Sequence, residues 1–289
     1  MVTSQMVEQR EYMLGRTNAE HDRLNRQGRL ISGITQHFLD EMDLRPGMRV
    51  LDVGSGVGDV ALLAARMVAP EGHVIGIDLD DAALNRARDR AAQEGLGNVE
   101  FHACDIHHYS SDDLFDAVLG RCVLLHQHDP AEALKSAARC VRLGGVVAFQ
   151  EPWFSRGFSF PKLPLFDQVI GWLHKMVQDS GLDGDIGLRL PSLFATAGLP
   201  APRLSFELLV NCSPDSEIFS FVVDTVRSLL PRLEQLGVTN AAQVKVDTLV
   251  GRLREEQAQF RSMVGVMPLM GAWCRKPEDS KLQYIIESS

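Results

Sequence analysis

Short apolar segments alternate with amphipathic ones between residues 46 and 152. Five apolar segments are rich in β-branched and aliphatic residues and predict strands, at 48–53, 73–78, 98–105, 114–124 and 144–152. Three segments between them have apolar residues at helical spacing and predict helices, at 60–69, 81–95 and 130–142. Strands that alternate with helices over short loops form βαβ units. We therefore expect an α/β fold with a doubly wound, mostly parallel sheet and helices on both faces.

Helical spacing continues on both sides of this region. Residues 18–44 predict a helix that begins at the N-cap residue Asn18. After Pro152 we expect helices at 164–180, 190–199, 215–236 and 240–262, and strands at 202–210 and 265–276. The two late strands bring the predicted sheet to seven. We divide the chain into N-terminal helices at 1–45, a Rossmann-like core at 46–152, a region at 153–276 that completes the sheet and carries an inserted helical cap, and a tail at 277–289.

The sequence VLDVGSGVGD, residues 50–59, places a glycine-rich turn after the first strand. Glycines at 54, 56 and 58 permit positive φ and close approach of the backbone to a ligand. Dinucleotide-binding turns have the spacing G-x-G-x-x-G, whereas here Asp59 occupies the last glycine position. Asp52 also precedes the glycines, and its carboxylate would repel a pyrophosphate but suits an ammonium group. The turn therefore favours a cofactor without a pyrophosphate.

Asp78 ends the second strand, 20 residues beyond Gly58. A carboxylate at this point of a βαβ unit can accept hydrogen bonds from the two vicinal hydroxyls of a ribose. Nicotinamide-dependent enzymes share this feature, so Asp78 alone leaves two classes of cofactor open.

The motif DVGSGVG at 52–58 resembles the first motif of the class I S-adenosylmethionine-dependent methyltransferases, and the resemblance extends in order over residues 40–152. It implies S-adenosylmethionine as cofactor and S-adenosylhomocysteine as product. It also implies Asp78 at the ribose, Asp105 at the adenine amino group and Arg121 beside the methionine end, although Arg121 could instead form a structural ion pair. The implied cofactor-binding residues in this core are Asp52, Gly54, Ser55, Gly56, Gly58, Asp78, Leu79, Cys104, Asp105, Ile106 and Arg121.

The resemblance further implies that the N-terminal segment closes as a lid, with Tyr12 touching the methionine end or the substrate. His126 and His128 follow the fourth strand, and either imidazole could act as a general base. The alternative is that one caps the next helix and the other is solvent-exposed. Trp153, Phe154, Trp172 and His174 could line a pocket for an apolar substrate, or pack the later helices onto the sheet.

The expected function is methyl transfer to a small, apolar or aromatic metabolite. Oxygen is the favoured acceptor atom, with carbon and nitrogen as further candidates. Two other classes stay open: an NAD(P)-dependent oxidoreductase, and a non-catalytic protein that binds S-adenosylmethionine.

Composition removes several other classes. The chain has 29 lysines and arginines against 38 acidic residues, a formal charge of −9, so a nucleic-acid substrate is not expected. The five cysteines are far apart and the histidines follow no metal-binding spacing, so we expect free thiols and no metal ion. No apolar run approaches the ~20 residues that span a membrane. We expect a cytoplasmic protein with a small-molecule substrate, and leave a homodimer open.

Overall fold

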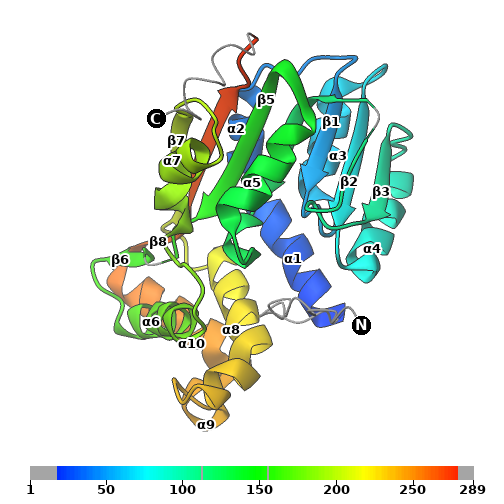
Figure 1. Ribbon diagram of the computed structural model, residues 1–289. Helices are drawn as coiled ribbons and strands as arrows, with labels where there is room; N and C mark the ends of the chain where they lie inside the picture. Colours follow the sequence, from blue (N-terminus) through cyan, green and yellow to red (C-terminus); the bar gives the residue numbers. More distant parts are fainter. Residues whose placement is uncertain (1–17, 112, 155, 279–289) are drawn as a thin grey trace, which may run out of the picture.

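The computed structural model describes residues 18–111, 113–154 and 156–278, and within them one mixed sheet of eight strands is covered by helices on both faces (Figure 1). The strands are β1 (Arg49–Val53), β2 (His73–Asp78), β3 (Val99–Ala103), β4 (Phe115–Arg121), β5 (Val141–Pro152), β6 (Phe158–Phe160), β7 (Arg203–Asn211) and β8 (Met263–Arg275).

The sheet has the order β3-β2-β1-β4-β5-β8, and its first five strands are parallel. β8 is antiparallel to three neighbours: β5 and β6 pair with it along one side, and β7 pairs with it along the other. The prediction of seven strands was therefore wrong by one. β6 spans three residues and is followed directly by Pro161, too short a segment to show an apolar period.

The helices are α1 (Asn18–Leu30), α2 (Ser32–Asp40), α3 (Asp59–Val68), α4 (Asp81–Gln93), the 3-10 helix η1 (Leu124–His126), α5 (Pro130–Arg139), α6 (Pro164–Asp179), α7 (Ile186–Thr196), α8 (Glu217–Gln235), α9 (Ala241–Val244) and α10 (Val246–Phe260). The single helix expected at 18–44 is divided into α1 and α2 at Ile31. Asp80 and Asp129 begin α4 and α5, because each carboxylate accepts hydrogen bonds from two backbone N–H groups of the first turn.

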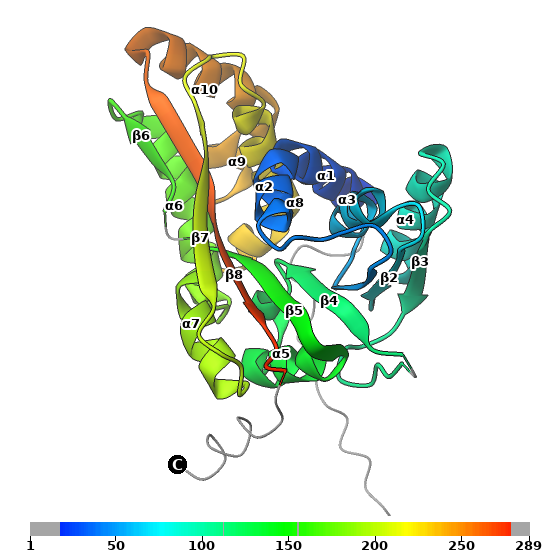
Figure 2. The same ribbon diagram turned by 90° about the horizontal axis from the view of Figure 1, so that it is seen from above.

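Two apolar layers sandwich the parallel strands. Figure 2 shows α2, α3 and α4 on one side of the sheet and α5 and α7 on the other. Leu62 of α3 and Leu84 of α4 are buried in the first layer, and Leu134 of α5 and Phe194 of α7 are buried in the second. Burial on both faces explains why β1, β4 and β5 are almost continuous apolar runs.

A third apolar core lies outside the sandwich, between α6, α8 and α10 and the first half of β8. Phe166 and Phe219 meet edge-on at its centre, with ring centroids 6.2 Å apart. Figure 1 shows α1 and α8 beyond the ends toward which β1 and β5 point, and Arg26 of α1 forms an ion pair of 2.7 Å with Asp224 of α8. The carboxyl ends of the parallel strands, where α/β folds bind ligands, thus face α1 and α8.

Candidate functional site

The glycine turn connects β1 to α3 with all three glycines at positive φ: 65° at Gly54, 52° at Gly56 and 87° at Gly58. At Gly54 a Cβ atom would overlap the Val123 side chain, so glycine is needed there for packing. At Gly56 a Cβ atom would meet no atom within 4 Å. Gly56 therefore faces open space, which a ligand can approach at backbone distance.

Asp78 links this turn to the end of β2. Its Oδ2 accepts a hydrogen bond of 2.8 Å from the Gly56 N–H, and its Oδ1 accepts one of 2.8 Å from the Asp80 N–H. Burial raises the pKa of Asp78, and the two backbone donors oppose that rise. The carboxylate therefore lies beside the open space at Gly56, held in one orientation.

Asp52 lies at the end of β1 with only 1% of its surface exposed. Its Oδ2 atom has no hydrogen-bond partner within the described residues. Burial raises the pKa of Asp52 to about 8, while Arg121 lowers it. A buried carboxyl group with an unsatisfied oxygen suits a ligand that brings a cation or a donor.

Arg121 ends β4 and is held in a network of mostly half-buried side chains. Its guanidinium forms an ion pair of 3.0 Å with Asp59 and donates a hydrogen bond of 2.9 Å to the Thr35 hydroxyl. The other Asp59 oxygen pairs with Arg90 at 2.7 Å. The structural ion pair considered for Arg121 is therefore present. Asp59, in the position of the missing third glycine, connects α3 to α1, α2 and α4.

The helix α1 contacts this network at Gly28, where a Cβ atom would overlap the Asp59 carboxylate. Because Asp59 is fixed by Arg90 and Arg121, we expect Gly28→Ala to lower the free energy of unfolding by about 1–3 kcal/mol. Gly33→Ala in α2 is the matched control. A Cβ at Gly33 meets nothing within 4 Å, so alanine should stabilise the helix by up to about 1 kcal/mol. Urea unfolding measures the change in the free energy of unfolding for both variants. Equal changes in the two variants would contradict the close approach of Gly28 to Asp59.

The ends of β2 and β3 lie side by side, with Asp78 opposite Ala103. Leu79 is 47% exposed there although it is apolar, while Ile106 is buried. Asp105 accepts a hydrogen bond of 2.9 Å from the His107 N–H, and Cys104 is half-buried beside it. The fold thus brings these predicted cofactor residues to the same sheet end as the glycine turn.

Residues 44–182 match the model of a family described as a methyltransferase domain. The match includes the glycine turn, Asp52, Asp78, Asp105 and Arg121. This match identifies residues 44–182 as a methyltransferase domain, similar to those of the class I S-adenosylmethionine-dependent methyltransferases.

Relatives of this chain agree with that match. The chain is 33% identical over 143 residues to the ubiquinone/menaquinone biosynthesis C-methyltransferase UbiE of Vibrio vulnificus, covering 46% of this chain and 55% of the relative. It is 36% identical over 109 residues to an arsenite methyltransferase of Halobacterium salinarum, covering 37% and 28%. An uncharacterized 37.1 kDa transposon protein of Streptomyces fradiae is 36% identical over 169 residues, covering 58% and 48%. The chain thus spans 28 to 55% of the length of these relatives.

Solved structures share the fold at lower identity. The [4+2]-cyclase SpnF aligns with 86% of this chain and 82% of its own, at 20% identity and a TM-score of 0.51. The YcgJ protein of Bacillus subtilis aligns with 86% of this chain and 100% of its own, at 16% identity and a TM-score of 0.52. These similarities extend the shared fold beyond residue 182 into the later helices and strands.

Glu151, which lies near the end of β5 beside the candidate site and is fully buried, was not singled out from the sequence. Its carboxylate accepts hydrogen bonds from the backbone N–H groups of Val123 at 2.9 Å, Leu124 at 2.8 Å and Leu125 at 3.4 Å. Burial raises the pKa of Glu151 to about 7, and the three donors oppose the rise. Its signal in the sequence was a charged residue at the end of an otherwise apolar strand. Glu151 fixes η1, the segment that carries His126.

The two predicted histidines differ in environment. His126 lies in η1, and burial lowers its pKa to about 4, so its imidazole is neutral at physiological pH. His128 is exposed, two residues further along. Both follow β4 at the carboxyl end of the sheet, as predicted.

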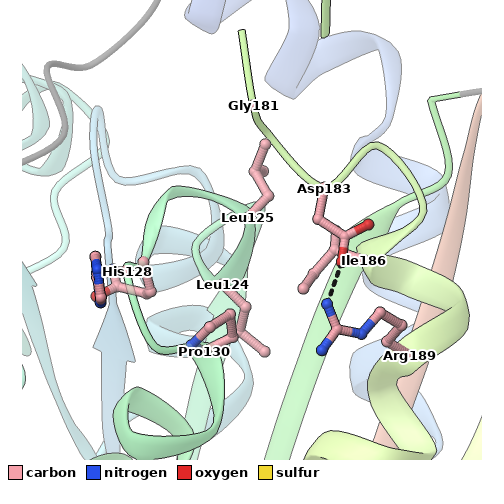
Figure 3. A pocket seen from close by; sticks show the side chains of 9 residues that line it. Leu124, Leu125, His128, Pro130, Gly181, Asp183, Ile186 and Arg189 are labelled. Atoms are coloured by element: carbon pink, nitrogen blue, oxygen red, sulfur yellow. Dashed lines mark hydrogen bonds and ion pairs between the residues drawn. The ribbon is translucent and has the colours of Figure 1, made fainter. Parts of the chain in front are cut away.

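His128 lines a pocket of about 220 Å³ between the loop after β4 and the start of α7 (Figure 3). Figure 3 shows Leu124 and Pro130 on one wall and the Asp183–Arg189 ion pair, 2.6 Å long, on the other. The lining of the pocket combines the apolar side chains of Leu125 and Ile186 with the polar side chains of Gln127, His128, Asp183 and Arg189, and more of its surface is polar than apolar. The described residues place this pocket beside η1.

The four predicted substrate residues do not line this pocket. Trp153 contacts Phe206 of β7, with ring centroids 6.3 Å apart, and Arg156 lies over its ring at 5.1 Å. Phe154 and Trp172 pack against the core between α6, α8 and α10, and His174 is half-buried on α6. Tyr12 falls outside the described residues.

Two further features are absent from the described part of the chain. No helix in it is long and apolar enough to cross a membrane. In the same residues, no three His, Cys, Asp or Glu side chains lie close enough together to hold a metal ion.

Proposed function

We propose that this chain transfers the methyl group of S-adenosylmethionine to a small molecule. The observation that carries the proposal is the junction of the glycine turn and Asp78: a carboxylate held by the Gly56 N–H, next to a position where a Cβ atom would meet nothing within 4 Å. Asp52 lies in β1, two residues before Gly54, and is buried. Its unsatisfied oxygen suits the cofactor's ammonium group. These groups fit a cationic cofactor that carries a ribose.

The nucleoside half of the cofactor is assigned to the ends of β2 and β3. Asp78 accepts from the ribose hydroxyls, and Asp105 accepts from the adenine amino group. The apolar side chains of Leu79 and Ile106, with Cys104, enclose the adenine ring.

The methionine half is assigned to the glycine turn. The backbone of residues 54–58 supports it, and Arg121 orders that side of the site through Asp59. When bound, the cofactor supplies an electrophilic methyl group.

On the substrate side, the protein orients the acceptor and excludes water. We assign the proton-accepting role to His126 because its imidazole is neutral and because Glu151 fixes the backbone of η1, which carries it. This favours an acceptor that loses a proton, with a hydroxyl oxygen as the first candidate and carbon or nitrogen as the others. The names of two relatives specify arsenite and quinone-pathway substrates, which makes the acceptor atom the point to test.

The substrate class follows from what surrounds the cofactor site. We propose that the cluster of α6, α8 and α10 forms a cap over the carboxyl ends of the strands, and that the substrate is small and apolar or aromatic. The apolar core that α6, α8 and α10 share supports this placement of the cap.

Titration calorimetry tests the cofactor directly. We expect S-adenosylhomocysteine to bind saturably with micromolar affinity or tighter, and NADH to show no saturable heat. Binding of NADH without S-adenosylhomocysteine would instead establish the oxidoreductase alternative. A panel of phenols, quinols, amines and arsenite, incubated with labelled S-adenosylmethionine, then identifies the acceptor. Tight cofactor binding with no transfer to any acceptor would point to the non-catalytic alternative.

A further inference from the structure

β7 is an edge strand whose outer side is open. It pairs with β8 along one side, and in the described ranges no strand pairs with its other side. None of its nine residues is buried. Its register with β8 is regular from Arg203 to Glu207 and becomes irregular only between Glu207 and Leu209. An open, regular edge presents backbone N–H and C=O groups that favour pairing with another strand.

The two faces of this segment differ in chemistry. Leu204 and Phe206 are each 51% exposed on one face, although both are large and apolar. On the other face, the Arg203 guanidinium lies 5.2 Å from the Trp273 ring, and Glu207 is 3.4 Å from His37. Edge strands in native proteins are commonly protected by charged side chains, by bulges or by being short. β7 has nine residues, its pairing with β8 is regular over 203–207, and the face of 203–207 that carries Leu204 and Phe206 has no charged side chain.

The sequence Arg-Leu-Ser-Phe-Glu, residues 203–207, is complementary to itself when read in the opposite direction. If a second copy of β7 lies antiparallel about a two-fold axis at Ser205, Arg203 falls opposite the partner's Glu207. Leu204 falls opposite the partner's Phe206. Both contacts occur twice in such a pair, as a two-fold interface requires.

We propose that this chain forms a two-fold symmetric dimer in which β7 pairs antiparallel with the partner's β7, centred on Ser205. The pairing joins the two sheets and covers Leu204 and Phe206. Its charge pattern fixes the register, because a shift by two residues would remove both ion pairs and a shift by one would exchange the two faces.

Charge reversal tests this register. We expect the wild-type chain to be a dimer in sedimentation-velocity experiments at micromolar concentration. Arg203→Glu places two glutamates opposite one another at both ends of the pairing, and Glu207→Arg places two arginines there. Each variant should raise the dimer dissociation constant at least about tenfold. An equimolar mixture of the two variants should dimerise again, because every glutamate of the first variant then faces an arginine of the second at positions 203 and 207. The double variant should dimerise alone.

Glu100→Arg is the matched control, since it reverses an exposed charge on β3 at the opposite edge of the sheet. It should leave the dimer unchanged. Circular dichroism and S-adenosylhomocysteine titration establish that each variant is folded. A wild type that is monomeric at about 100 µM, single variants that dimerise as tightly as wild type, or a mixture that stays monomeric would each overturn the proposal.

Discussion

Asp78→Ala should weaken binding of S-adenosylhomocysteine by about 100-fold or more, close to 3 kcal/mol. The substitution removes the carboxylate that we assign to the ribose hydroxyls. It also leaves the Gly56 and Asp80 N–H groups without their acceptor, so the glycine turn loses its link to β2. Asp78→Asn keeps one acceptor oxygen and should give an intermediate loss. Titration calorimetry at a temperature where all variants are folded measures the series.

Asp81→Ala provides the comparison for this series. Asp81 is also an acid at the start of α4, but its exposed carboxylate pairs with Arg88 and does not reach the glycine turn. We expect the Asp81→Ala variant to bind S-adenosylhomocysteine with a dissociation constant within about threefold of the wild-type value. An Asp78→Ala protein that unfolds cooperatively and binds S-adenosylhomocysteine within the same limit would remove Asp78 from the site.

The sequence predicted the parts of the site that depend on local rules. Gly54, Gly56 and Gly58 were identified because a turn below a ligand needs positive φ, and all three have it. Asp78 was identified from its distance to the turn, which one βαβ unit fixes. The seven predicted strands are all present, and for the five parallel ones the reason is similar: parallel strands covered by helices are apolar segments with helical segments between them.

Residues that act across the fold were not predicted. Asp59 was noted only as a departure from the dinucleotide motif, although it joins Arg90 and Arg121 and limits the approach of α1 at Gly28. Glu151 had no partner nearby in the sequence, because its three donors lie 26 to 28 residues earlier. Trp153 could be assigned to a pocket or to packing from its type alone, and only the sheet order brings it to Phe206 of β7. Such contacts depend on strand order, which periodicity does not encode.

Substitution of Glu151 should have a large effect on the stability of the fold. Glu151→Ala should lower the free energy of unfolding by about 3 kcal/mol or more, because it leaves the N–H groups of Val123 and Leu124 buried without an acceptor. Glu151→Gln keeps one acceptor oxygen and should cost less. Chemical unfolding at fixed pH, followed by circular dichroism, measures both variants. Asp129→Asn is the comparison: it changes an exposed carboxyl that caps α5, and asparagine is an equally good N-cap.

The pH dependence separates the charge of Glu151 from its hydrogen bonds. Its pKa is about 7 in the folded protein against an ordinary value of 4.5, so the folded state holds a proton that the unfolded state has lost between these values. The stability from this protonated form is present below pH 4.5 and is lost as the pH rises through 7. Glu151→Gln removes this loss, so the stability difference between wild type and variant should shift in favour of the variant by on the order of 3 kcal/mol between about pH 4.5 and 7.5. A difference that stays constant over this range would show that Glu151 is ionised throughout, and that its three backbone donors outweigh its burial.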